Sequence, residues 1–431
     1  MTKQQTIPFW IAVIININIV IGAAFFLGAQ SITVKSGILS PFAWLFCGFL
    51  LLPLVAVFAW FAKRHPEAGG LYVYSQRSLG SFWGFLSGWG YFVGTTAGNA
   101  AVIHAFSSYL QNVAPVHRVL APCGLLGLKF DLLLVLFFTG LNAINIQFME
   151  RAQIFFVVMK TIPMLVLIVG AFSAMFVGTS VSYVPQAWDF SSFFETIPMV
   201  FFAYVGFEAC CAVADKIGDS QRKASAVIWS SFGIIMLVYV VLQFCALRVQ
   251  GSFDVNPFLH AIGLFISDPV VAELLSNIVY ATIMLSFLGG FYGMYFYNSW
   301  NLYAIAQNKN IIGGSYLTKL TKNQIPWVCL IVQCSLLSVF LLLTTADSYL
   351  VVIGDFGVTI GYLLTTIAFF VASKNKIVAL AALLSCSFLL YLCSKSLVDA
   401  GMYNLIPLLI VLGIGIVAYK GKQLLNQQHV R

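Results

Sequence analysis

The feature that most constrains this chain is a series of apolar stretches, each of about 20 residues, that recurs along its 431 residues. A helix of about 20 residues is long enough to cross the ~30 Å hydrocarbon layer of a bilayer. Hydrophobic residues make up 61% of the chain and charged residues 8%, whereas an ordinary soluble domain has roughly 25% charged residues. The bilayer is therefore the expected solvent, and an all-α membrane protein is the expected fold class.

Twelve apolar segments, separated by charged or Pro/Gly/Asn-rich breaks, predict about twelve transmembrane helices. They lie at 7–30, 40–61, 82–110, 131–147, 154–176, 194–214, 225–247, 273–304, 326–345, 349–372, 377–393 and 405–419. We expect a first five-helix group (1–176), a second five-helix group (190–372), and two further helices with a cytoplasmic tail (373–431). The insert from Arg248 to Val271 is long enough to form a short surface helix.

The basic residues follow the rule that Lys and Arg of short loops are retained on the cytoplasmic side. With both termini inside, sixteen of the 22 Lys and Arg fall on the cytoplasmic side, five fall on the other side, and Lys160 lies within a span. The formal net charge of +8 is therefore a topology signal and does not indicate a nucleic-acid partner. The predicted location is a bacterial-type inner (plasma) membrane, crossed many times, with the N-terminus and the C-terminus cytoplasmic.

Two predicted spans carry polar and small residues where a lipid-facing helix carries bulky ones. The first contains Asn16, Asn18 and Gly22-Ala23-Ala24, and the sixth contains Tyr204, Gly206 and Glu208. Transporters built from inverted repeats interrupt helices at corresponding places in their two halves, which frees N–H and C=O groups to bind a solute. The alternative is that the small residues only allow close helix packing. Glu208 lies in the matching span of the second group, where a charged residue costs about 2.5–3.5 kcal/mol of insertion free energy. The broken-helix interpretation is therefore favoured.

Three motifs carry a resemblance to a known family. They are Pro66–Tyr74, which contains Gly-Gly-x-Tyr-x-Tyr, Gly98-Asn99 in the third span, and Phe202–Glu208 followed by Lys216 and Arg222-Lys223. Over essentially its whole length the chain resembles amino acid permeases of the amino acid–polyamine–organocation (APC) superfamily, whose first cytoplasmic loop, third helix and sixth helix are similar to these motifs. The resemblance implies a 5+5 inverted repeat (LeuT-like) with broken helices 1 and 6, plus two C-terminal helices.

The same resemblance implies where a substrate binds. In the family, N–H groups at the span-one break meet the substrate carboxylate, and carbonyls of spans one and six meet its ammonium group, as helix-end electrostatics favours. Carried onto this chain, the implied substrate-binding residues are Ile21, Gly22, Ala23, Ala24, Phe202, Ala203, Tyr204, Gly206 and Phe291. The family usually has Gly-Ser-Gly at the first break. Here Ala24 adds a methyl group where the carboxylate would approach the backbone.

The aromatic residues Tyr91, Phe202 and Phe291 are at positions similar to those of family residues that cover the substrate or gate its exit. Gating roles are implied for Tyr91 and Phe202, and also for Glu208, which lies on the outward route. Aromatic residues make up 15% of the chain, so ordinary packing is the alternative for each ring. Phe291 follows Gly289-Gly290, a spacing that permits close approach of a solute.

Lys160 lies about six residues, or ~9 Å of helix rise, inside the fifth predicted span. Its stem could therefore extend to the cytoplasmic surface. The competing interpretation comes from sodium-independent family members, in which a span-five lysine resembles a replacement for bound sodium and contacts carbonyls at the first break. A buried lysine changes protonation state readily, so Lys160 is a candidate for proton coupling.

Two acidic residues inside spans are further candidates. Glu208 is a second residue for proton coupling, and its alternative role is to hold the unwound part of span six by hydrogen bonds. Asp355, between Gly354 and Phe356 in span ten, either attracts a basic substrate or lies near the outer interface.

Other classes of protein fit less well. The five histidines stand apart without an HExxH spacing, and the nine cysteines form no CxxC pair, so neither an enzyme nor a metal or other cofactor is expected. A channel or a receptor does not explain two interrupted helices at matching points.

The predicted function is sodium-independent secondary active transport of amino acids, by proton-coupled symport or exchange, with alternating access. The alternative is an antiporter that exchanges a basic amino acid for its decarboxylated amine. The expected partners are an amino acid or amine, protons and the lipid bilayer, with a homodimer as an open alternative.

Overall fold

The computed structural model describes residues 7–111, 114–177, 190–218, 220–249, 256–308, 311–343, 347–400 and 406–428. These residues form seventeen α-helices and two 3₁₀ helices, which confirms the all-α fold class. Their bounds are α1 (Phe9–Val20), α2 (Ala23–Ser36), η1 (Gly37–Leu39), α3 (Ser40–Arg64), α4 (Gly70–Leu79), α5 (Ser81–Gln111), α6 (Ala114–Leu120), α7 (Leu128–Asn142), α8 (Ile146–Val177), α9 (Phe190–Tyr204), η2 (Ala209–Lys216), α10 (Ser220–Val249), α11 (Pro257–Gly263), α12 (Pro269–Gln307), α13 (Gly314–Leu317), α14 (Trp327–Leu343), α15 (Asp347–Ala372), α16 (Lys376–Ala400) and α17 (Ile406–Gln428).

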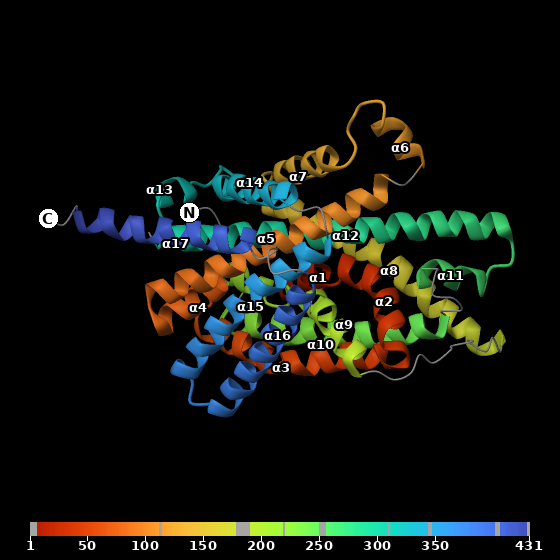
Figure 1. Ribbon diagram of the computed structural model, residues 1–431, viewed down its shortest axis with the longest axis horizontal. Helices are drawn as coiled ribbons and strands as arrows, with labels where there is room; N and C mark the ends of the chain where they lie inside the picture. Colours follow the sequence, from red (N-terminus) through yellow and green to blue (C-terminus); the bar gives the residue numbers. More distant parts are fainter. Residues whose placement is uncertain are drawn as a thin grey trace.

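The helices form one bundle, in which the 39-residue α12 runs along the long axis of the molecule (Figure 1). Eight helical segments in the described part of the chain are long and apolar enough to cross a membrane, and α1 and α14 are shorter apolar helices. Each of the twelve predicted spans overlaps a helix, and the spans at 7–30, 131–147 and 194–214 are each divided between two helical segments. The number of spans that cross the bilayer, the inverted repeat and the division into 1–176, 190–372 and 373–431 stay predictions.

The first predicted interruption is present. Helix α1 ends at Val20 and α2 begins at Ala23, with extended backbone at Ile21 (φ −77°, ψ 95°) and at Gly22 (φ −142°, ψ −147°). The break therefore lies at the small-residue cluster that the sequence singles out.

The second interruption lies between Tyr204, where α9 ends, and Ala209, where η2 begins. Gly206 has a φ of 107°, a left-handed conformation that only glycine adopts readily. A side chain there would also meet Ile19 and Met294 at 3.0 Å. The glycine thus allows the chain to turn while it packs against the end of α1.

The two interrupted spans also contact each other, just before α1 begins and where η2 ends. The Ile7 N–H donates to the Lys216 carbonyl at 2.7 Å, and the Gly218 N–H donates to the Ile7 carbonyl at 3.1 Å. The segment that enters α1 is therefore tied to the segment that leaves η2.

Three local predictions differ from the structure. The Gly-Gly-x-Tyr-x-Tyr motif was expected in a loop, but it begins helix α4, where Tyr72 and Tyr74 are buried. The predicted surface helix of the 248–271 insert exists as α11, but Phe258 and Ile262 are buried, since this helix packs on α8 and α12. Finally, α8 begins at Ile146 instead of 154, which places Gln153 inside the bundle.

Helices α5 and α15 pack against each other along glycine-rich faces. An added side chain at Gly94 would come within 2.7 Å of Gly354 and Gly357 backbone atoms, and one at Gly354 would meet the Gly98 backbone at 3.1 Å. Small residues let membrane helices approach closely. This contact fixes the two helices that face the interrupted segments.

Candidate functional site

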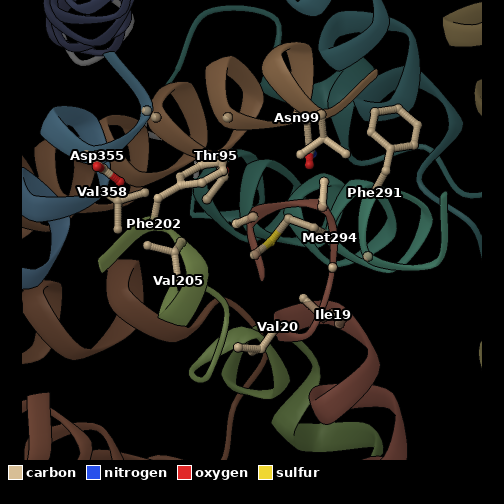
Figure 2. A pocket seen from close by; sticks show the side chains of 18 of the residues that line it. Ile19, Val20, Thr95, Asn99, Phe202, Val205, Phe291, Met294, Asp355 and Val358 are labelled. Carbon is tan, nitrogen blue, oxygen red and sulfur yellow. The ribbon is translucent and has the colours of Figure 1, made fainter. Parts of the chain in front are cut away.

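A cavity of about 60 Å³ lies where the two interrupted spans meet α5, α12 and α15 (Figure 2). Its walls are mostly apolar, with a few polar side chains and exposed backbone, as is typical of small-molecule sites. The lining residues are Ile19, Val20, Gly22, Ala23, Ala24, Gly94, Thr95, Gly98, Asn99, Val102, Phe202, Val205, Phe287, Gly290, Phe291, Met294, Gly354, Asp355 and Val358.

The N-terminus of α2 faces this cavity with Gly22, Ala23 and Ala24. The first N–H groups of a helix have no acceptor within the helix. Among the described residues, no backbone acceptor outside α2 takes the N–H groups of these three residues. The helix end therefore presents donors and a positive partial charge to the cavity, which suits an anionic group.

The carbonyl groups at the end of α1 are mostly occupied by side chains. Lys160 donates from Nζ to the Asn18 carbonyl at 2.8 Å and also to the Ile21 carbonyl. Its side chain is only 2% exposed, so the alternative in which it extends to the surface is wrong. Lys160 forms no ion pair with a described carboxylate. The Ile19 carbonyl, by contrast, accepts no backbone or side-chain bond from the described residues outside its helix.

Gln153 supports the same end of α1, and sequence reasoning missed it. It accepts a hydrogen bond from the Asn18 side chain and donates to the Gly289 carbonyl at 3.3 Å. An added side chain at Gly290 would meet the Ile19 carbonyl at 3.1 Å. Gly290 thus makes room for the end of α1 as well as for the cavity. Gly289 packs against Phe156, whereas Gly290 and Phe291 line the cavity, and the close approach of a solute to this pair of glycines stays a prediction.

Tyr239 on α10 links the two interruptions, and it too was missed. Its hydroxyl oxygen lies 2.9 Å from the Val20 carbonyl oxygen and 2.8 Å from the Ala203 carbonyl oxygen. One hydroxyl hydrogen is shared between two carbonyls that would otherwise lack a donor at the helix ends. Asn16 adds a second link, because its amide donates to the Phe207 carbonyl at 2.8 Å.

Glu208 holds the second interruption. It accepts a hydrogen bond from the Tyr91 hydroxyl at 2.6 Å and another from the Gly206 N–H at 3.2 Å, and it is 1% exposed. These contacts agree with the alternative role of Glu208, in which it holds the unwound part of span six by hydrogen bonds. The gating roles of Tyr91 and Glu208, and proton transfer by Glu208, stay predictions.

The cavity separates the predicted binding residues into two sets. Gly22, Ala23, Ala24, Phe202 and Phe291 line it, whereas Ile21, Ala203, Tyr204 and Gly206 do not. Tyr91, which was predicted as a gating residue, does not line it either. The Ile21 N–H donates to Ile17 and its carbonyl accepts from Lys160, while the Tyr204 hydroxyl donates to the Trp44 carbonyl at 3.1 Å. The cavity is lined instead by Ile19, Val20 and Val205, which are neighbours of predicted residues but were not predicted themselves.

Phe202 stands between this cavity and a larger one of about 360 Å³, which we term the vestibule. The two share Ala23, Ala24, Val102 and Phe202, and the vestibule also has Lys35 and Glu195 in its wall. An added methyl group at Gly98 would meet the Phe202 ring at 3.0 Å. The ring therefore lines both spaces, and its gating role stays a prediction.

Asn99 and Asp355 are the polar side chains of the cavity that lack partners. Among the described residues, neither the Asn99 Nδ2 nor either carboxylate oxygen of Asp355 has a hydrogen-bond partner. Within the same residues, no three His, Cys, Asp or Glu side chains gather in a way that could hold a metal ion. The cavity thus combines apolar walls with the N-terminus of α2 and these two polar side chains.

Comparisons with known proteins place this arrangement in a family. A family model described as amino acid permease matches residues 7–419. The chain is 26% identical over 252 residues to an uncharacterized transporter of Mycobacterium tuberculosis, covering 56% of this chain and 52% of that protein. It is 22% identical over 377 residues to the serine/threonine exchanger SteT of Bacillus subtilis, covering 86% and 84%. The branched-chain amino acid permease BcaP of the same species is 25% identical over 253 residues, covering 53% and 52%.

The match to two of these relatives therefore spans about half of their length, whereas the family model covers nearly the whole chain. The family consists of transporters and not of enzymes, which agrees with the class predicted from the sequence. The apolar helices of this chain, together with its relatives, show that it is a membrane protein. The chain belongs to the amino acid permease family of the amino acid–polyamine–organocation superfamily.

Proposed function

We propose that the protein is a sodium-independent secondary active transporter of amino acids that works by alternating access. The observation that carries this proposal is the contact of the Lys160 ammonium group with the Asn18 and Ile21 carbonyls. A fixed cation at the broken end of α1 supplies the charge that a bound sodium ion supplies in other carriers. No metal ion is then needed to hold the break in shape.

The substrate class follows from the helix ends. The α2 N-terminus offers N–H groups to a carboxylate, and the Ile19 carbonyl, at the other side of the break, is available to an ammonium group. A zwitterionic amino acid satisfies both. The names of the relatives, a serine/threonine exchanger and a branched-chain amino acid permease, support amino acids as the cargo.

Coupling is proposed to run through protons or through exchange. Lys160 is buried and makes only carbonyl contacts, so loss of its proton would release Asn18 and Ile21 and loosen the break. Glu208 is the second proposed proton-responsive group, since it holds the other interruption through Tyr91 and Gly206. Phe202 is proposed to gate the path from the vestibule.

The proposed location is the inner (plasma) membrane with both termini cytoplasmic, from the distribution of Lys and Arg. In that orientation the vestibule side, which carries Lys35 and Glu195, faces outward. A substrate would then enter from outside, pass Phe202 and reach the break.

The test is uptake by proteoliposomes that contain the purified protein, with a panel of labelled amino acids, with and without sodium and with and without a pH gradient. The proposal expects saturable uptake and counterflow without sodium, and a response to the pH gradient or to amino acid on the other side. Lys160→Ala should remove the pH response. Unsaturable flux would indicate a channel, and a strict need for sodium would contradict the assignment of Lys160.

A further inference from the structure

Asp355 is a buried carboxylate whose oxygens have no hydrogen-bond partner among the described residues. It lies on α15 beside Gly354, is 0% exposed, and lines the cavity together with Thr95 and Val358. Neither carboxylate oxygen accepts a hydrogen bond from any described residue. In the described part of the chain, Lys, Arg and His are absent from the lining of this cavity.

An isolated charge in a low-dielectric site is unfavourable, so a buried carboxylate is found with a cation, with hydrogen-bond donors, or in its neutral form. None of the described residues supplies a cation or a hydrogen-bond donor to Asp355, and a neutral carboxyl group there would also be left without hydrogen-bond partners. An aliphatic or aromatic residue would fill the same space without that cost. The partner of Asp355 is therefore expected to come from outside the protein.

The place of Asp355 in the cavity indicates which part of a substrate it meets. The α-carboxylate and α-ammonium groups of an amino acid are accounted for at the break, by the α2 N-terminus and the Ile19 carbonyl. Asp355 belongs to another wall, on α15, and Figure 2 shows it next to Val358 and away from Ile19 in that view. The group left to reach it is the end of the substrate's side chain.

We propose that Asp355 binds a positive charge on the substrate's side chain, and that the substrates are basic amino acids. This inference rests on the proposed function, because it assumes that the α-amino and α-carboxylate groups bind at the break. A side-chain ammonium or guanidinium group pairs with Asp355 through charge-assisted hydrogen bonds. Asn99 stands in the same cavity, and its side-chain oxygen can accept a further hydrogen bond from that cationic group.

The test compares ligands that differ in this one charge. Uptake or ligand-induced thermal stabilisation of the parent protein is measured with lysine against norleucine, and with arginine against citrulline. The half-saturating concentration of lysine should be lower than that of norleucine by about tenfold or more. In Asp355→Asn this advantage should fall to about twofold or less, while norleucine binds as before.

Asp131→Asn is the matched control, because Asp131 is an equally buried carboxylate that contacts His104 and not the cavity. It should keep the preference for lysine. If the parent binds norleucine as well as lysine, the inference is wrong, whether or not Asp355→Asn folds. Uptake of neutral amino acids alone would also overturn it and leave the proposed function standing. If no amino acid of any class is bound or carried, the proposed function fails together with the inference.

Discussion

The Lys160 ammonium nitrogen lies 2.8 Å from the backbone carbonyl oxygen of Asn18, at the point where α1 unwinds. The same ammonium group reaches the Ile21 carbonyl, so one side chain of α8 holds both sides of the last turn of α1. Helix ends in the interior of a membrane need such partners, because no water is there to satisfy them. Lys160 thus satisfies two of the carbonyl groups that the break in α1 exposes.

Gly206→Ala should destabilise the protein. The residue would have to adopt a left-handed φ of 107° and its methyl group would lie 3.0 Å from Ile19 and Met294. Backbone strain of this kind costs about 1–3 kcal/mol. Thermal unfolding in detergent measures it. Gly233→Ala on α10 is the control, since an added side chain meets nothing within 4 Å there, and it should raise stability by ~0.5–1 kcal/mol. Equal effects of the two substitutions would contradict this account of the second interruption.

Tyr239→Phe should lower stability and slow transport, because the Val20 and Ala203 carbonyls lose their shared donor. A buried group left without its partner costs about 1–3 kcal/mol. The control is Tyr391→Phe, whose ring is 64% exposed and whose change should stay within ~0.5 kcal/mol. If Tyr239→Phe unfolds at the same temperature as the parent, the hydroxyl does not hold the two interruptions together.

Glu208 and Tyr91 should be energetically coupled. Their 2.6 Å hydrogen bond is buried, and a cycle of Glu208→Gln, Tyr91→Phe and the double variant should give an interaction energy of about 0.5–3 kcal/mol. We also expect the pH dependence of uptake to become flatter in Glu208→Gln. A variant that is less stable but keeps the parent's pH profile would show that Glu208 only holds the unwound segment.

Phe202→Ala should open the path between the vestibule and the cavity. A cysteine placed at Thr95 reports on this path, through its rate of reaction with a membrane-impermeant thiol reagent, in a background where the exposed Cys123 is changed to Ser. The rate should rise by about tenfold if the ring is a gate. Phe172→Ala, on the exposed face of α8, should leave the rate as it is. An unchanged rate in Phe202→Ala would place the barrier elsewhere.

The sequence allows both interruptions to be predicted because small and polar residues are out of place in an apolar span. Gly22 and Gly206 mark the breaks, and Glu208 and Lys160 are conspicuous as charges in apolar surroundings. The chemical type of these residues is thus enough to locate the two breaks along the chain. It does not say which neighbour faces the cavity, since unwound backbone has no helical period from which side-chain directions can be derived.

Ala203 and Tyr204, which the family resemblance implied as substrate-binding residues, do not line the cavity, whereas Val20 and Val205 do. Tyr239 could not be recognised, as it is one of 18 tyrosines and its role depends on a contact between distant helices. Gln153 was missed because Glu150 and Arg151 made the span seem to begin at 154. The chemistry of single residues can be read from the sequence, but the packing between helices cannot be predicted from it.

The most direct test of the central claim, that Lys160 takes the place of a bound sodium ion, is equilibrium binding of the best-transported amino acid in sodium-free buffer. The parent protein should bind it with the same affinity whether or not sodium is added. Lys160→Met should bind it more weakly than the parent, while Lys129→Met, a change of an exposed lysine, should bind it as the parent does. A parent that binds only when sodium is present, or a Lys160→Met variant that binds as tightly as the parent, would contradict the account.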